Sequence, residues 1–209
     1  MAVGVLILGE SGTGKSASLR NFEPDEISVI NVSGKPLPFR KKLPIFHTDD
    51  YEKIKNALKK SPAKTIVIDD SQYLMANAYM RYADVRGYDK FVTMAQNHWD
   101  LVYFVEKELP DDVIVYFLSH IDRDQYGNEK VKTVGKMIDS AITFEGMFAI
   151  VLKTKVADGK YYFTTHNSGF DTVKSPIGMF EEDEIPNDLK MVNDTIIKYY
   201  GLDKREQHD

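Results

Sequence analysis

The run Gly9-Glu10-Ser11-Gly12-Thr13-Gly14-Lys15-Ser16 fits the phosphate-binding pattern G-x-x-x-x-G-K-[ST]. It directly follows the apolar stretch Val3 to Leu8, and such a loop binds an anion when it joins a buried strand to a helix. Glycines let main-chain N–H groups approach phosphate oxygens closely. Lys15 would supply charge to the β- and γ-phosphates, and Ser16 a hydroxyl to Mg²⁺. The alternative is a chance glycine-rich turn. We expect ATP and Mg²⁺ as cofactors, bound by Gly9, Glu10, Ser11, Gly12, Thr13, Gly14, Lys15, Ser16 and Ala17.

A second polar element is the run Thr65-Ile66-Val67-Ile68-Asp69-Asp70, an apolar strand that ends in two carboxylates. This is the form of a Walker B motif. The carboxyl end of a parallel strand faces the crevice in which a nucleotide lies, so we expect Asp69 to hold Mg²⁺ together with Ser16. Asp70 is either the base that orients the attacking water or the N-cap of a helix that begins near Ser71.

The apolar run Val113 to Leu118 ends in Ser119-His120. A polar residue at that strand end would reach the γ-phosphate and report its hydrolysis to the following loop. We therefore interpret His120 as a sensor of the γ-phosphate, with a surface histidine as the alternative.

Composition limits the class of protein. A chain of 209 residues with 43% hydrophobic content can bury one sizeable core, which predicts a single domain over 1–202 and a charged, flexible tail over 203–209. A net charge of −5 argues against a protein that coats duplex nucleic acid. Cysteine is absent, which excludes disulfides and thiolate metal sites. The N-terminal apolar run is too short for a signal peptide or a membrane span, so we expect a cytoplasmic protein with no membrane partner.

The elements that must position these residues are short β-branched runs, which predict a mainly parallel sheet covered on both faces. They are Val3 to Leu8, Ile27 to Val32, Pro44 to Phe46, Thr65 to Ile68 and Val113 to Leu118.

Helices are expected between several of these runs, over Asp49 to Lys60 with Asp49 or Asp50 as N-cap, and over Leu74 to Glu108 with a break near Arg86-Gly87. Within the second stretch, Trp99 and Tyr103 are at helical spacing and are expected to pack in the core. An Asp158-Gly159 turn predicts a C-terminal β-hairpin. A final amphipathic helix is expected from Asn187 or Asp188 to Tyr200, ended by Gly201. The fold class is therefore α/β.

The order of these elements resembles the RecA-like core of P-loop NTPases, in which the strand matching Val115 to His120 ends in a sensor pair. The runs Phe170 to Phe180 and Ile185 to Leu189 resemble phage-encoded nucleotide-binding proteins, the core-only RecA-like recombinases implicated in single-strand annealing. The resemblance implies a Mg²⁺-dependent ATPase of phage origin, slow or DNA-stimulated, that acts in recombination or annealing in the host cytoplasm. It also implies single-stranded DNA, further copies of the chain and a phage single-strand-binding protein as partners.

The chain departs from the RecA pattern at Ser33, where RecA has a glutamate that activates water. Either Asp70 takes over that role or hydrolysis is slow. The resemblance further implies that Lys174 reaches the γ-phosphate of a neighbouring subunit. The alternative for Lys174 is a surface lysine beside a turn at Pro176.

In RecA-like proteins the loop after the sensor strand binds DNA, and here it is Ile121 to Lys136. Its cations would neutralise phosphates and its tyrosine would stack on a base; these residues are Arg123, Tyr126, Lys130, Lys132 and Lys136. A solvated hairpin is the alternative, because acidic residues nearly balance the charge. A second candidate is Arg81 to Lys90.

Two other functions use the same loop. One is a nucleotide-gated regulator, such as a helicase-loader-like protein. The other is a small-molecule kinase, which would need an arginine-rich lid that the chain does not show after the sensor strand.

Overall fold

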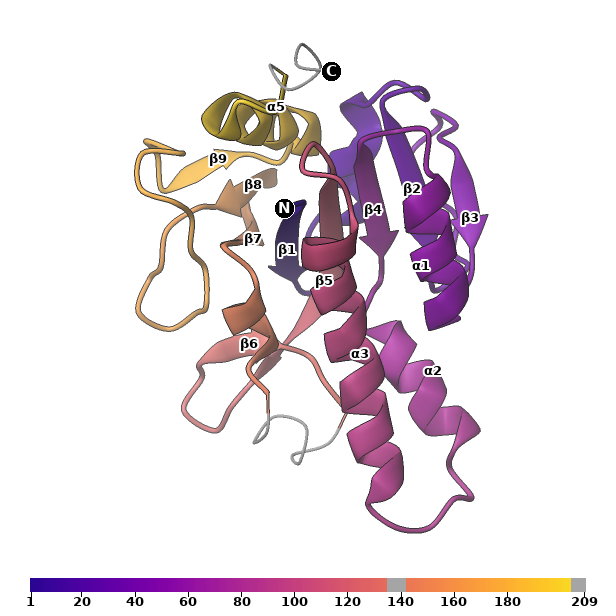
Figure 1. Ribbon diagram of the computed structural model, residues 1–209. Helices are drawn as coiled ribbons and strands as arrows, with labels where there is room; N and C mark the ends of the chain where they lie inside the picture. Colours follow the sequence, from indigo (N-terminus) through magenta and orange to yellow (C-terminus); the bar gives the residue numbers. More distant parts are fainter. Residues whose placement is uncertain (135–141, 204–209) are drawn as a thin grey trace.

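A mixed sheet of nine strands forms the centre of the computed structural model, which describes residues 1–134 and 142–203 (Figure 1). The strand order is β3-β2-β4-β5-β1-β7-β8-β9, and β6 pairs with β5 outside this path. The first six strands of the order are parallel, whereas β6, β8 and β9 run antiparallel to their partners. The strand bounds are β1 Val3–Gly9, β2 Ile27–Asn31, β3 Ile45–His47, β4 Thr65–Asp69, β5 Ile114–Arg123, β6 Glu129–Val131, β7 Ile150–Ala157, β8 Lys160–Thr164 and β9 Glu184–Pro186.

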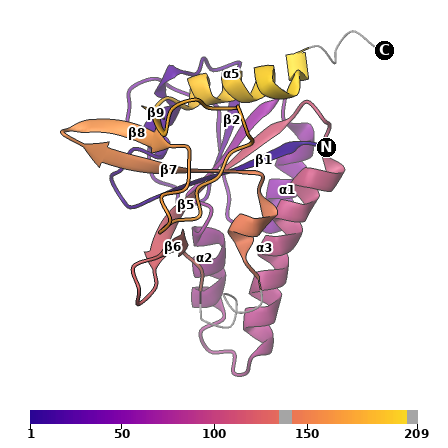
Figure 2. The same cartoon turned by 90° about the vertical axis from the view of Figure 1, so that its left-hand side faces the viewer.

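Helices cover both faces of the sheet (Figure 2). Side chains alternate along a strand, so Leu6 and Leu8 of β1 pack toward α1 and α3, whereas Val5 and Ile7 pack toward η1 and α5. The predicted α/β fold with a mainly parallel, doubly covered sheet is thereby confirmed. The helices are α1 Tyr51–Lys60, α2 Tyr73–Arg81, α3 Asp89–Glu108 and α5 Leu189–Tyr200, with the 3₁₀ helices η1 Ser16–Asn21 and η2 Phe144–Met147.

Several predicted boundaries are confirmed. The side chain of Asp50 accepts hydrogen bonds from the first turn of α1, and Gly201 ends α5 in the left-handed conformation with φ 64°. Gly87, with φ 101°, lies between α2 and α3. Asp158 and Gly159 both have positive φ, 51° and 71°, as the tight turn of the β7-β8 hairpin requires.

Two expectations are wrong. Strand β5 does not end at Leu118 but continues to Arg123, because residues 121–123 pair with β6 in an antiparallel hairpin. Trp99 and Tyr103 do not pack in the core: they are 38% and 43% exposed and stack on each other with ring centroids 5.0 Å apart. The buried stripe of α3 instead includes His98.

None of the described helices is both long and apolar enough to cross a membrane. Of the tail predicted for 203–209, all but Asp203 lies outside the described residues.

Candidate functional site

The glycine-rich loop follows β1 and is braced by the C-terminal part of the chain. The hydroxyl groups of Thr13 and Thr154 are 2.6 Å apart, and a Cβ added at Gly9 would lie 1.8 Å from the Thr154 hydroxyl. Gly14, with φ 97°, has Asn187 on its other side, where an added Cβ would come within 3.2 Å of the amide oxygen. The loop therefore needs glycine at these positions for close approach as well as for backbone conformation.

Lys15 is buried, and its ammonium group donates hydrogen bonds of 2.8 Å to the carbonyl oxygens of Gly9 and Glu10. Burial lowers the pKa of Lys15 to about 8, although the nearby charges of Asp70 and Asp69 act to raise it. The side chain is thus a cation held in the loop by main-chain acceptors, which phosphate oxygens can replace.

Ser16 and Asp69, which the sequence predicts to hold Mg²⁺, are in direct contact. The hydroxyl of Ser16 donates a 2.8 Å hydrogen bond to the Asp69 carboxylate, which is buried at the end of β4. Burial raises the pKa of Asp69 to about 6, and the Ser16 hydrogen bond only partly offsets this. Within 1–134 and 142–203, no three His, Cys, Asp or Glu residues group as metal ligands. The oxygen donors of Ser16 and Asp69 suit Mg²⁺, which these two residues would hold.

Asp70 follows β4 with φ 60°, the left-handed conformation that is uncommon for residues other than glycine. One carboxylate oxygen lies 3.5 Å from His120 Nε2 and the other 3.8 Å from Lys35 Nζ. Partial burial alone would raise the pKa of Asp70, but hydrogen bonds from His120 and Ser33 and the charge of Lys35 lower it to about 2. The N-cap alternative does not hold, because α2 has Gln72 at its N-cap position and no side-chain cap bond.

His120 lies on β5 directly beside Gly9 of β1. Its main-chain N–H donates to the Gln72 side-chain oxygen at 3.2 Å, and its ring meets the ring of Tyr73 edge-on at 6.3 Å. Because β5 lies between β4 and β1, His120 is placed between the acidic pair and the phosphate loop.

These residues line one cleft of about 500 Å³ at the carboxyl ends of the parallel strands. The structure brings together the predicted Lys15, Ser16, Asp69, Asp70 and His120, and adds four that the sequence reasoning missed. The cleft is lined by Ser11, Gly12, Gly14, Lys15, Ser16, Ala17, Lys35, Pro36, Pro38, Asp69, Asp70, His120 and Tyr161.

Lys35 is the most informative of the missed residues, since its ammonium group lies 3.8 Å from the Asp70 carboxylate and helps to lower the pKa of that group. Its ammonium group also lies over the Tyr73 ring, 5.1 Å from the centroid. The sequence feature that could have identified Lys35 is its position as a basic residue directly after Gly34, at the turn that follows β2.

Lys174 lies apart from this cleft. Its main chain exchanges two hydrogen bonds with Val151 of β7, of 2.8 and 2.9 Å, and its side chain is exposed. A role for Lys174 in a neighbouring subunit stays a prediction.

The predicted DNA-binding loop is the β5-β6 hairpin. Tyr126 is 77% exposed and Lys132 is exposed, whereas Lys130 is half-buried. Arg123 forms ion pairs with Glu10 of the phosphate loop at 2.7 Å and with Glu129 at 3.0 Å. Lys136 lies outside the described residues.

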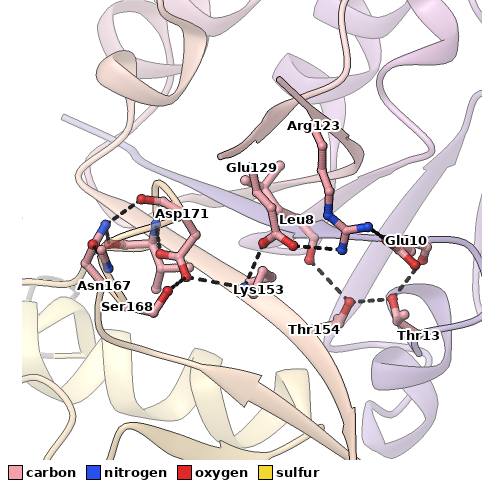
Figure 3. Close-up of polar contacts among 12 residues, drawn as sticks. Leu8, Glu10, Thr13, Arg123, Glu129, Lys153, Thr154, Asn167, Ser168 and Asp171 are labelled. Carbon is pink, nitrogen blue, oxygen red and sulfur yellow. Dashed lines mark hydrogen bonds and ion pairs between the residues drawn. The ribbon is translucent and has the colours of Figure 1, made fainter. Parts of the chain in front are cut away.

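Arg123 is the first cation in a chain of ion pairs that the sequence did not reveal (Figure 3). Glu129 joins Arg123 to Lys153 of β7, at 2.7 Å from the latter, and Lys153 continues to Asp171 at 3.2 Å. The chain connects the phosphate loop with the β5-β6 hairpin and with the segment that precedes Lys174.

A comparison of the chain with protein-family models and with curated protein sequences finds no match. The assignment of the site rests on its residues and their geometry.

Proposed function

We propose that this protein is a Mg²⁺-dependent ATPase with a RecA-like core that acts on single-stranded DNA in recombination or annealing. The observation that carries the proposal is the convergence of Lys15, Ser16, Asp69, Asp70 and His120 on one cleft. A lysine in a glycine-rich loop, a hydroxyl paired with a carboxylate, and a second carboxylate beside them are the parts that phosphoryl transfer from a nucleoside triphosphate uses.

The loop performs the binding step. On arrival of ATP, Lys15 exchanges the carbonyl groups of Gly9 and Glu10 for phosphate oxygens, and loop N–H groups donate to the same phosphates. Ser16 and Asp69 would hold Mg²⁺, which would supply positive charge to the β- and γ-phosphates. The short 3₁₀ helix η1 offers less of a dipole than a full α-helix, so Lys15 carries more of the anion binding.

Asp70 orients the attacking water. With a pKa of about 2 it is ionised at neutral pH, which makes it a good hydrogen-bond acceptor and a weak proton acceptor. The transition state of phosphoryl transfer is loose and demands orientation more than proton removal. His120 fixes the Asp70 carboxylate, and its place on β5 allows it to respond to loss of the γ-phosphate.

The RecA-like assignment is supported by the position of Asp70 relative to Ser33. The Ser33 side chain, two residues beyond the end of β2, forms a hydrogen bond with Asp70. The carboxylate therefore reaches the point of the cleft where the RecA pattern has its glutamate, so Asp70 is suited to replace that residue.

The test is ATP hydrolysis with and without oligothymidine, over a range of Mg²⁺ concentrations. We expect Lys15→Ala to abolish productive ATP binding while its circular dichroism stays parental. Unchanged ATP affinity of Lys15→Ala in titration calorimetry would refute the assignment.

A nucleotide-gated regulator is the second candidate, and Ser33 favours it, because a serine stands where the RecA pattern has the glutamate that activates water. If the ATPase proposal is right, Asp70→Asn keeps ATP affinity and loses at least tenfold in kcat. A regulator would bind ATP and change conformation with no DNA-stimulated turnover in either protein. Arginine is absent from the described lining of the cleft, so nothing there favours a kinase lid.

A further inference from the structure

The segment between β2 and β3 forms a wall between the nucleotide cleft and a second cleft of about 470 Å³. Pro36 borders both clefts. One face of the wall presents Lys35 to Asp70, and the other presents Arg40, Lys41 and Lys42 to the second cleft.

This wall is the strongly basic part of an acidic chain. Residues 27–48 contain four cations and no aspartate or glutamate, although the whole chain has a net charge of −5. Arg40 and Lys42 are exposed, and no residue in 1–134 or 142–203 forms an ion pair with either of them. Lys41 differs, because it bonds to Glu23 at 2.8 Å and to the Phe22 carbonyl at 3.1 Å. Arg40 and Lys42 therefore present positive charge that no residue in the described part of the chain neutralises.

The wall is held in place at both ends. Asn31 donates to the Lys35 carbonyl and accepts from the Gly34 N–H, both at 2.7 Å. Leu43 is buried in the core at the other end, and prolines at 36, 38 and 44 restrict the backbone between and beyond these anchors. The two cations are thus presented at fixed positions, with little conformational entropy to lose on binding.

We propose that this second cleft binds single-stranded nucleic acid. Arg40 and Lys42 would neutralise successive phosphates, and the rings of Phe39 and His47, which line the same cleft, offer faces on which a base can stack. His47 belongs to β3, the edge strand of the sheet, and is exposed. A duplex stays stiff over about 150 base pairs and would meet only the rim of so small a cleft.

The β5-β6 hairpin is less suited to this role. Arg123 is already paired with Glu10 and Glu129, and Asp122 and Asp124 are exposed beside it, which repels a polyphosphate chain. This inference deepens the proposed function, since it names where the single strand lies.

The wall would also couple nucleic-acid binding to ATP hydrolysis. Lys35 precedes Pro36, which borders both clefts, and its ammonium group is 3.8 Å from the Asp70 carboxylate. A strand bound to Arg40 and Lys42 would fix the wall, and with it the cation that faces the water-orienting group. ATP hydrolysis would then depend on nucleic acid.

The direct test is fluorescence anisotropy of labelled oligothymidine titrated with protein in the absence of ATP. We expect the double variant Arg40→Gln, Lys42→Gln to bind at least tenfold more weakly, and its log K against log salt slope to be smaller by roughly 1.4, since each phosphate contact contributes about 0.7 on a single strand. The control Lys130→Gln, Lys132→Gln has the same change of charge and should keep the parental slope. Parental binding by the first variant, or equal loss in both, would overturn the proposal.

A second pair of variants tests the faces of β3, because neighbouring side chains of a strand point to opposite sides. His47→Ala should weaken binding several-fold and Phe46→Ala should not; the reverse result contradicts the cleft. Equal affinity for duplex DNA, or binding to phosphatidylserine vesicles with none to oligothymidine, also overturns it.

Thermal unfolding of every variant checks that the fold is retained. Because the titration omits ATP, dependence on Arg40 and Lys42 would uphold the cleft even if no ATP hydrolysis were found. If the protein hydrolyses ATP but the double variant binds oligothymidine as tightly as the parent does, the ATPase proposal stands and the cleft proposal fails.

Discussion

Lys15 and Asp69 are held in the cleft with their pKa values displaced toward neutrality from opposite sides. Burial lowers that of Lys15 to about 8 and raises that of Asp69 to about 6. Both shifts disfavour the charged form that ligand binding requires. If the protein binds Mg²⁺ and ATP as proposed, binding therefore includes two proton transfers with the solvent, and these have opposite signs.

The first prediction is that proton linkage reverses with pH. Near pH 6, ionisation of Asp69 releases about half a proton on binding, and near pH 8, charging of Lys15 takes up about half a proton. Calorimetry in buffers of different ionisation enthalpy measures both. The Asp69→Asn protein should release about half a proton less at pH 6 and should keep the proton uptake at pH 8. Proton release from the nucleotide itself is the same in both proteins and cancels when they are compared. An identical linkage in both proteins would contradict the role of Asp69.

The second prediction concerns neighbouring carboxylates with opposite effects on stability. The folded pKa of Asp69 lies above its unfolded value, so its contribution to stability is lost as pH rises from about 4 to about 6. The folded pKa of Asp70 lies below its unfolded value, so its contribution to stability is present above about pH 4 and is lost as pH falls toward 2. At pH 7, Asp69→Asn should raise the free energy of unfolding by up to about 2 kcal/mol and Asp70→Asn lower it by a similar amount. Urea denaturation of ligand-free protein measures both changes. If the two substitutions change the free energy of unfolding in the same direction, the environments described for Asp69 and Asp70 are wrong.

At the scale of elements, the ion-pair chain joins β5, β6 and β7 to the phosphate loop. Its two ends differ in burial. The Arg123 and Glu10 side chains are 54% and 52% exposed, whereas Lys153 is 20% exposed and its partner Asp171 only 2%. Buried pairs are costly to break from one side, whereas exposed pairs contribute little.

The third prediction follows from this difference. Lys153→Met should cost about 3 kcal/mol of stability, because it leaves the Asp171 carboxylate buried without its cation, and Arg123→Met should cost much less, because its ion pairs are exposed. Urea denaturation at low and high salt distinguishes them, since only the cost at Arg123 should shrink with salt. Similar costs at both positions would mean that burial does not determine how much these ion pairs contribute to stability.

The elements show what the sequence can predict. Asp50, Gly87 and Gly201 were recognisable because caps and breaks depend on a few adjacent residues. The extension of β5 past His120 depends instead on pairing with β6. The exposure of Trp99 depends on which side of α3 meets the sheet. Likewise Lys15, Ser16 and Asp69 belong to local motifs, whereas Lys35 reaches Asp70 only because β2 and β4 are adjacent.

For the whole molecule, the fourth prediction concerns assembly. If Lys174 acts on the γ-phosphate of a neighbouring copy, Lys174→Ala should bind ATP yet fail to assemble or hydrolyse cooperatively, and mixing it with Lys15→Ala should restore part of the activity. Light scattering and ATPase assays measure the two effects. Lys132→Ala, another exposed lysine, is the control. Cooperative turnover by Lys174→Ala alone, or no rescue on mixing, would remove Lys174 from the mechanism.

Strand β1 lies between β5 and β7, with Val3 opposite Ile114 and Val5 opposite Ile150. On a ribosome that adds about 5–20 residues per second, about 7–30 s therefore pass before both partner strands of β1 have been made. The phosphate loop waits longer, because Thr154 and Asn187 brace it. If the loop binds ATP as proposed, the nascent chain therefore offers no complete site until Asn187, shortly before α5, has been made.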